Sequence, residues 1–155
     1  MKKNFALFFL IILFPCIPGC SRSDTFKNIT YSENVTIKGV PQDELYRRIA
    51  IWVTFTFRRT LSHVMYADGD EGIIKIRYIY SISQDMAASI RSDITVEVRA
   101  ERYTISFSDV WYQALDEKNQ PYGEETTLPS QDVADKLLNQ WKILIGDLKD
   151  VIPRL

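Results

Sequence analysis

Few side chains in this sequence have the types and spacing that chemistry requires. His63 is the only histidine, and a general base needs an orienting carboxylate and a nucleophile, which the sequence does not tie to it. Asp68, Asp70 and Glu71 could offer oxygen ligands to calcium, but an EF-hand needs another acid or amide where Gly72 stands. We therefore expect His63 to lie at the edge of a strand and the acidic residues to form a solvated turn. We expect the protein to bind neither a metal nor another cofactor.

The most specific chemical signal is a cysteine that follows an apolar N-terminal run. Lys2 and Lys3 precede residues 5–14, which are all apolar and too few for a spanning helix of about 20 residues. The run closes in Ile17-Pro18-Gly19-Cys20, which resembles the bacterial lipobox, where the cysteine receives diacylglycerol before cleavage. We expect Cys20 to carry lipid with acyl chains such as palmitate. The alternative is ordinary secretion with cleavage elsewhere, which would leave Cys20 as a plain thiol.

This motif divides the chain into three parts. Residues 1–19 are the expected signal peptide of the lipoprotein type, residues 20–27 the lipidated N-terminus and tether, and residues 28–153 a single domain. The expected location is the bacterial cell envelope, held to a membrane through the N-terminal lipid. Ser21 stands where an aspartate retains some lipoproteins in the inner membrane, so the outer membrane is favoured.

Composition narrows the class of partner. The chain has 20 acidic and 19 basic residues, with a formal net charge of −1, which argues against nucleic acid as a partner. Cys16 leaves with the signal and Cys20 takes the lipid, so the mature domain has no cysteine left for a disulfide, a thiolate metal site or a nucleophile.

Hydrophobic periodicity predicts the elements that position these residues. Apolar side chains recur at three- and four-residue steps over residues 42–59 and from Pro129 to Pro153, which indicates two helices. Alternating patterns indicate strands at about residues 27–40, 62–66, 74–82, 93–100 and 103–112. Residues 84–92 and 114–128 are expected to be polar connections.

The expected fold class is α+β. The order strand, helix, four strands, helix favours an antiparallel sheet with both helices on one face and solvent on the other. The inward positions hold large aromatic residues that are more typical of a core than of a ligand platform: Trp52, Tyr78, Tyr80, Trp111 and Trp141. Asp109 falls on the apolar side of its strand, which indicates either a bulge or a fraying strand end.

The solvated sheet face is the best candidate for a binding surface. The residues expected there, mixed in charge and slightly basic, are Lys75, Arg77, Glu97, Arg99 and Ser106. Ile79 and Val110 are expected to point outward beside them, which hints at an interaction patch. The alternative is an ordinary half-exposed antiparallel sheet without a partner.

The middle of the chain, about residues 35–114, resembles a bacterial family. The resemblance is carried by Glu44-Leu45-Tyr46, Ala50-Ile51-Trp52, the turn and strand start at residues 68–74, and residues 94–112. The family is a domain of unknown function with a TATA-binding-protein-like (TBP-like) fold, common in exported and lipid-anchored proteins. It implies that fold and an envelope setting, and it implies no activity, because fold does not determine function.

Together these observations predict a non-enzymatic envelope lipoprotein whose domain binds a protein or glycan partner. Two alternatives stay open. One is an envelope hydrolase that acts on glycan or cell-wall material, and the other is a structural subunit of an envelope assembly.

Overall fold

The computed structural model describes residues 29–58, 60–82, 88–116 and 123–155. The predicted signal peptide, the lipidated Cys20 and the tether lie outside these residues. The elements in chain order are β1 (Tyr31–Thr36), α1 (Gln42–Phe57), β2 (His63–Asp68), β3 (Ile73–Ile82), β4 (Ala88–Arg99), β5 (Arg102–Ala114), α2 (Gln131–Val151) and the short 3₁₀ helix η1 (Ile152–Arg154).

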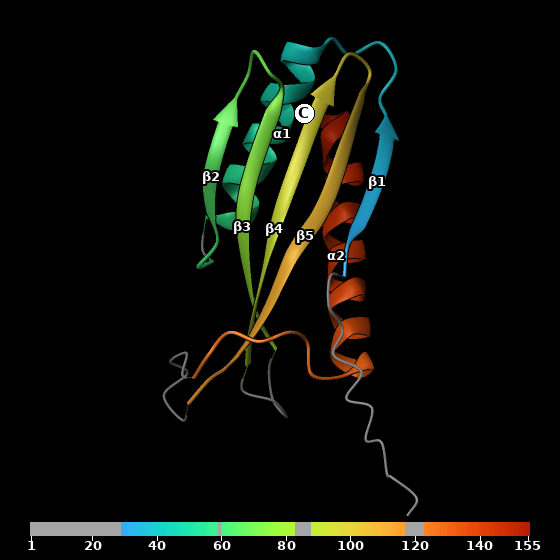
Figure 1. The fold of residues 1–155 in the computed structure, drawn as a ribbon. Coiled ribbons are helices and arrows are strands. Elements are labelled where there is room, and N and C mark those ends of the chain that lie inside the picture. The colour runs from blue at the N-terminus through green and yellow to red at the C-terminus, as the bar shows by residue number, and fades with distance from the viewer. Residues whose placement is uncertain (1–28, 59, 83–87, 117–122) are drawn as a thin grey trace, which may run out of the picture.

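All five strands form one antiparallel sheet in the order β1-β5-β4-β3-β2. Both helices lie behind this sheet in Figure 1, side by side on one face. The predicted α+β fold, with strand, helix, four strands and helix and with one face open, is therefore confirmed. We call the face without helices the open face.

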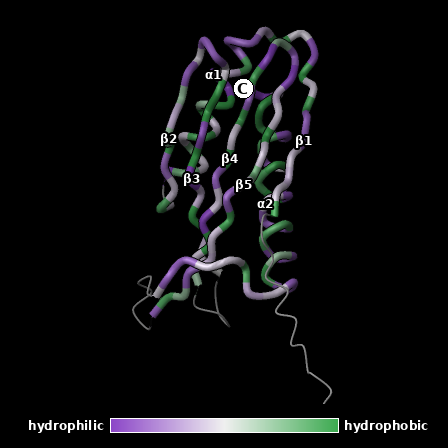
Figure 2. The backbone as a smooth tube through the Cα atoms, in the orientation of Figure 1, coloured by the Kyte–Doolittle hydropathy of each residue, from purple (hydrophilic) through white to green (hydrophobic). Residues whose placement is uncertain are grey.

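Alternation along the strands explains why one face carries the helices. Every second residue of β4 from Ala88 to Val98 is buried, and the residues between them are partly or fully exposed. Figure 2 shows the resulting alternation of hydrophilic and hydrophobic colour along the central strands. Because successive side chains of a strand point to opposite faces, the apolar set is buried only where helices cover it.

The helices are positioned by their ends and by aromatic contacts. The Ser130 side chain accepts a hydrogen bond from the Val133 amide at the start of α2, which satisfies one of the free donors there. Trp141 of α2 stacks on Phe107 of β5 with ring centres 4.7 Å apart. Trp52 of α1 donates its indole N–H to Asp147 of α2 at 2.7 Å, which ties the two helices together. Neither of these helices, within the part of the chain described, has the length and apolarity of a membrane span.

Two predicted connections are shorter than expected. β4 begins at Ala88, so residues 88–92 are strand and not polar connection. That stretch looks polar because Ser89 and Arg91 face the open side and Ser92 is a polar residue with only 1% exposure. The expected loop over residues 114–128 also contains a bridge, in which Thr126 and Tyr112 exchange two backbone hydrogen bonds of 2.8 Å.

Of the two alternatives for Asp109, a bulge and a fraying strand end, the structure shows a bulge within β5, and it reverses two side chains. Arg91 pairs with Trp111 and Asp93 pairs with Ser108, so Asp109 and Val110 together oppose Ser92. Asp109 has a φ of 50°, in the left-handed region. Beyond it the alternation is inverted: Val110 packs against the core and Trp111 is 40% exposed on the open face. The expectations that Trp111 points inward and Val110 outward were wrong, because the extra residue shifts the side-chain period by one.

Candidate functional site

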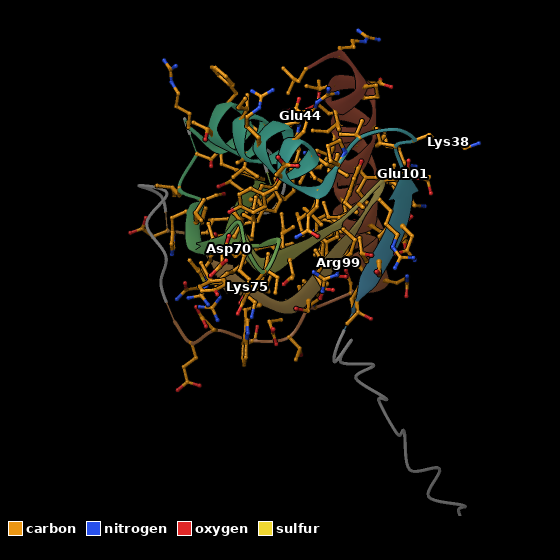
Figure 3. All side chains as sticks on the ribbon, turned by 90° about the horizontal axis from the view of Figure 1, so that it is seen from above. Lys38, Glu44, Asp70, Lys75, Arg99 and Glu101 are labelled. Atoms are coloured by element: carbon orange, nitrogen blue, oxygen red, sulfur yellow. The ribbon has the colours of Figure 1, made fainter. Side chains whose placement is uncertain are left out.

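The open face carries all of the predicted binding residues. Lys75 and Arg77 lie on β3, Glu97 and Arg99 on β4, and Ser106 on β5. The view from above in Figure 3 shows the helices on one side of the sheet and Lys75 and Arg99 directed to the other. The register places them in successive rows across the sheet, with Lys75 opposite Thr95 and Thr95 opposite Ser106.

Cross-strand hydrogen bonds hold the β1 side of this face. The hydroxyls of Ser106 and Ser32 are 3.1 Å apart, and Thr104 donates its hydroxyl to the Asn34 carbonyl oxygen at 2.5 Å. Such pairs on neighbouring strands fix side-chain rotamers and contribute about 0.2–1 kcal/mol each. This part of the open face is therefore pre-organised before any partner arrives.

A polar hollow of about 480 Å³ lies at one end of the open face. It is lined by Asn34, Thr36, Glu97, Arg99, Arg102 and Thr104. Arg99 donates to the backbone carbonyl of Glu71 at 2.8 Å, so the preceding turn positions this guanidinium. Among the described residues, Arg102 and Lys75 have no carboxylate within ion-pair distance. We call this end, with Lys75, the basic corner.

A second, more apolar hollow of about 220 Å³ lies toward the other end of the sheet. It is lined by Leu61, Arg77, Ile79, Ser89, Arg91, Trp111, Gln113 and Glu125. The Arg91 guanidinium carbon lies 5.7 Å from the centre of the Trp111 ring, and Arg91 also pairs with Glu125 at 2.6 Å. We call it the Trp111 hollow. The sequence analysis did not identify this hollow as a site. The signal for it was Asp109, the acid on the apolar side of β5, because the bulge there turns Trp111 to the open face.

Arg77 joins the Trp111 hollow to the centre of the face. Its guanidinium makes two bonds to the Asp93 carboxylate, of 3.1 and 3.3 Å. These charge-assisted bonds raise the pKa of Arg77, because they favour its charged form. Arg77 is thus a member of an internal ion pair, whereas Lys75 has no carboxylate within ion-pair distance in the part of the chain that the structure describes.

The acidic turn between β2 and β3 has a structural role. One Asp68 oxygen accepts the backbone N–H groups of Asp70 and Glu71, each at 2.9 Å. Tyr66 donates its hydroxyl to Glu71 at 2.8 Å, which raises the pKa of Tyr66 to about 12. The described residues contain no group of three potential ligands arranged for a metal ion.

The other candidate acids and the histidine are spread across the sheet. His63 and Asp68 lie at opposite ends of β2, and Asp109 lies on β5, separated from β2 by β3 and β4. His63 is exposed opposite Arg77, and Asp109 accepts a bond from the neighbouring Ser108 hydroxyl. The structure therefore does not assemble these residues into an acid–base or nucleophile pair.

Two solved structures share this architecture. A TBP-like protein from Parabacteroides distasonis superposes with a TM-score of 0.67 at 19% identity, over 81% of this chain and 92% of that one. A DUF4468 family protein from Bacteroides ovatus gives a TM-score of 0.50 at 15% identity, over 61% of this chain and 60% of that one. Identities this low establish the fold alone. No curated protein matches the chain.

The family itself is established by the sequence of the sheet and of the first helix. Residues 31–113, more than half of the 155-residue chain, match one family model. The match starts at the first residue of β1 and ends one residue before the end of β5. The resemblance found in the sequence is therefore confirmed, and the chain belongs to the DUF4468 family, a domain of unknown function with a TBP-like fold.

Proposed function

We propose that this protein is a bacterial cell-envelope lipoprotein, anchored through lipidated Cys20, whose open face binds a partner without catalysis. The anchor is supported by the lipobox-like sequence that ends at Cys20. The observation that carries the binding role is the open face itself, a five-stranded surface that neither helix covers and whose side chains are held in cross-strand pairs.

Pre-organisation is the physical reason why such a face suits binding. Ordering a rotamer-rich side chain at an interface costs about 0.5–1.5 kcal/mol. The bonds of Arg77 to Asp93 and of Thr104 to Asn34 already meet part of that cost in the free protein. Lys75 and Arg102, which have no ion-pair partner among the described residues, then favour a partner that offers acidic groups.

The geometry gives less support to a glycan hydrolase. Glycoside hydrolysis ordinarily uses two carboxyl groups about 5–9.5 Å apart that flank the scissile bond. The described lining of the polar hollow contains one acid, Glu97, and that of the Trp111 hollow contains Glu125, which is paired with Arg91. A binding role does not require such a pair of carboxyl groups, so it agrees better with the residues that line the two hollows.

The anchor is tested by replacing Cys20 and comparing membrane fractions. We expect Cys20→Ser to give an unlipidated protein that leaves the membrane fraction. Cys16→Ser is the matched control, because it removes a thiol from the same segment but leaves the lipid acceptor, and it should behave as wild type. Membrane association that survives Cys20→Ser would refute the anchor.

The open face is tested by site-specific photo-crosslinking in cells. A photoreactive residue at Thr95, in the middle of the open face, should capture a defined partner, whereas one at Lys142, exposed on α2, should not. Lys75→Glu with Arg102→Glu should abolish the Thr95 adduct, because both cations lie on that face and neither forms an ion pair within the described parts of the chain. Lys142→Glu with Arg154→Glu reverses two exposed cations elsewhere and should leave it intact. Equal adducts from both positions, or an adduct indifferent to the open-face charges, would contradict the proposal.

A further inference from the structure

We propose that the Trp111 hollow receives a large apolar side chain of a partner polypeptide, whose acidic residues then contact the basic corner. This inference rests on the proposed function and narrows its partner from protein or glycan to an extended polypeptide segment. It is carried by the bulge, by the hydrogen bonds around the hollow and by the positions of the cations in the basic corner.

The bulge places Trp111 on the open face, outside the hydrophobic core. Without the extra residue in β5, Trp111 would point toward the helices and be buried. Instead Asp109 adopts a left-handed backbone with a φ of 50°, and Trp111 stands 40% exposed. Bulges that re-aim a side chain, and non-glycine residues with positive φ, are enriched at functional sites. An outward tryptophan obtained in this way is better explained by a contact than by stability.

The size of the hollow indicates one side chain as its occupant. Its volume of about 220 Å³ is below the range of about 300–1,000 Å³ that is usual for small-molecule sites. Leu61, Ile79 and Trp111 supply apolar surface, and Leu61 is 76% exposed at its margin. Tryptophan and arginine are also the residues most often found at the energetic centres of protein interfaces.

The polar groups around the hollow are largely committed to one another. Arg77 is bound by Asp93, Arg91 by Glu125 and by the Trp111 ring, and the Gln113 amide N–H donates to the Gly123 carbonyl at 3.0 Å. A sugar ring needs donors and acceptors for its hydroxyls, and the carboxylate of Glu125 and the guanidinium of Arg77 are already engaged in these pairs. An apolar side chain leaves them in place and removes apolar surface from water.

Charge complementarity defines the rest of the segment. Lys75 lies four residues from Ile79 on β3, which is about 13 Å along the strand at about 3.3 Å per residue. The row of Arg99 and Arg102 lies eight residues from the row of Arg91 and Trp111 on β4 (99 − 91 = 8), or about 26 Å at the same rise. An extended segment that lies along the strands would therefore place acids about four and eight residues from its apolar side chain.

The test uses the full-length protein purified in detergent and a phage-displayed library of random 12-residue peptides, with counter-selection on the Trp111→Ala protein. Enriched peptides should share one large apolar residue with acids about four or eight positions away. When they are resynthesised with fluorescein, Trp111→Ala should weaken their binding at least about tenfold by fluorescence anisotropy. Ile143→Ala, which removes a side chain 65% exposed on α2, should change it less than about twofold. Lys75→Glu with Arg102→Glu should weaken binding and reduce its salt dependence.

Three results would overturn the inference. They are failure to enrich peptides, equal binding by wild type and by a Trp111→Ala protein that melts at the wild-type temperature, and Trp111-dependent binding of a glycan array in place of peptides. The Thr95 crosslink separates this failure from that of the proposed function. If the Thr95 adduct persists in the Trp111→Ala protein, the face binds and only the hollow is wrongly assigned. If the adduct is absent from the wild type, both are wrong.

Discussion

Gly72, in the turn between β2 and β3, is the position where a single methyl group should damage the fold most clearly. Its φ is 71°, a conformation that residues with a Cβ rarely adopt. A Cβ there would lie 2.5 Å from the Val98 carbonyl oxygen and 2.9 Å from the Gln42 side-chain nitrogen. The Gly72 carbonyl also accepts the Val98 N–H at 2.7 Å, so the turn cannot move without weakening this bond to β4.

The expected loss of stability follows from three contributions. A left-handed alanine costs about 1–2 kcal/mol. Relief of the contact with the Val98 carbonyl weakens a hydrogen bond worth about 1 kcal/mol. The lower entropy of the unfolded alanine chain returns about 0.4–1 kcal/mol. We therefore expect Gly72→Ala to lower the free energy of unfolding by about 2 kcal/mol, and the clash itself adds to this value.

Gly39 supplies the matched control. Its φ is 77°, but nothing lies within 4 Å of a Cβ built on it, so only the backbone and entropy contributions remain. Gly39→Ala should cost about 1 kcal/mol or less. Urea unfolding of both variants gives the comparison, and Gly72→Ala should melt about 4–8 °C below wild type. If the two substitutions cost the same within about 0.5 kcal/mol, close approach of the turn to β4 is not what requires Gly72.

Two further predictions concern single side chains. The buried Tyr103 hydroxyl has no hydrogen-bond partner among the described residues, and burial raises its pKa. Tyr103→Phe should therefore stabilise the fold by about 1 kcal/mol in urea unfolding. It should also reduce the loss of stability above pH 10, where only the tyrosine of the unfolded chain ionises. Destabilisation by Tyr103→Phe would show that the hydroxyl has a hydrogen-bond partner. Hydrogen bonds from Arg47 and Arg48 lower the pKa of Glu44 from 4.5 to about 2. Its contribution is thus present above pH 4.5 and lost as the pH falls toward 2, so Glu44→Gln should flatten stability against pH in that window. Parallel curves for Glu44→Gln and wild type would refute this role of Glu44.

Local hydrophobic patterns were sufficient to predict most of the helices and strands. The stripe that contains Leu45, Ile49 and Trp52 predicted α1 despite the β-branched and aromatic residues in its second half, because those residues continue the same apolar face. The alternation from Ile74 to Tyr78 predicted β3 and its buried side. Such periods report which side of an element meets the core, and they need no knowledge of its neighbours.

Local patterns failed where pairing with other strands decided the outcome. Ala88 to Ser92 have little strand character of their own, and they become strand because β3 and β5 hydrogen-bond to both sides of them. Likewise the sequence indicated a bulge or a fraying strand end at Asp109, but the choice between them and the effect on Trp111 depend on which residues of β4 oppose it. The register depends on both paired strands, so it cannot be predicted from the pattern of one strand alone.

The candidate site divides in the same way. The sequence by itself determined which side chains of Lys75, Arg77, Glu97, Arg99 and Ser106 share a face, because residues two apart in a strand point to the same side. The tertiary structure alone decided that Arg77 pairs with Asp93, whereas Lys75 has no ion-pair partner among the described residues, and that Trp111 stands beside Ile79 and Arg91. The physical reason is that the two-residue period of a strand sets the face to which each side chain points. The partners of that side chain lie on strands that are distant in sequence, and only the hydrogen-bond register of the sheet brings them together.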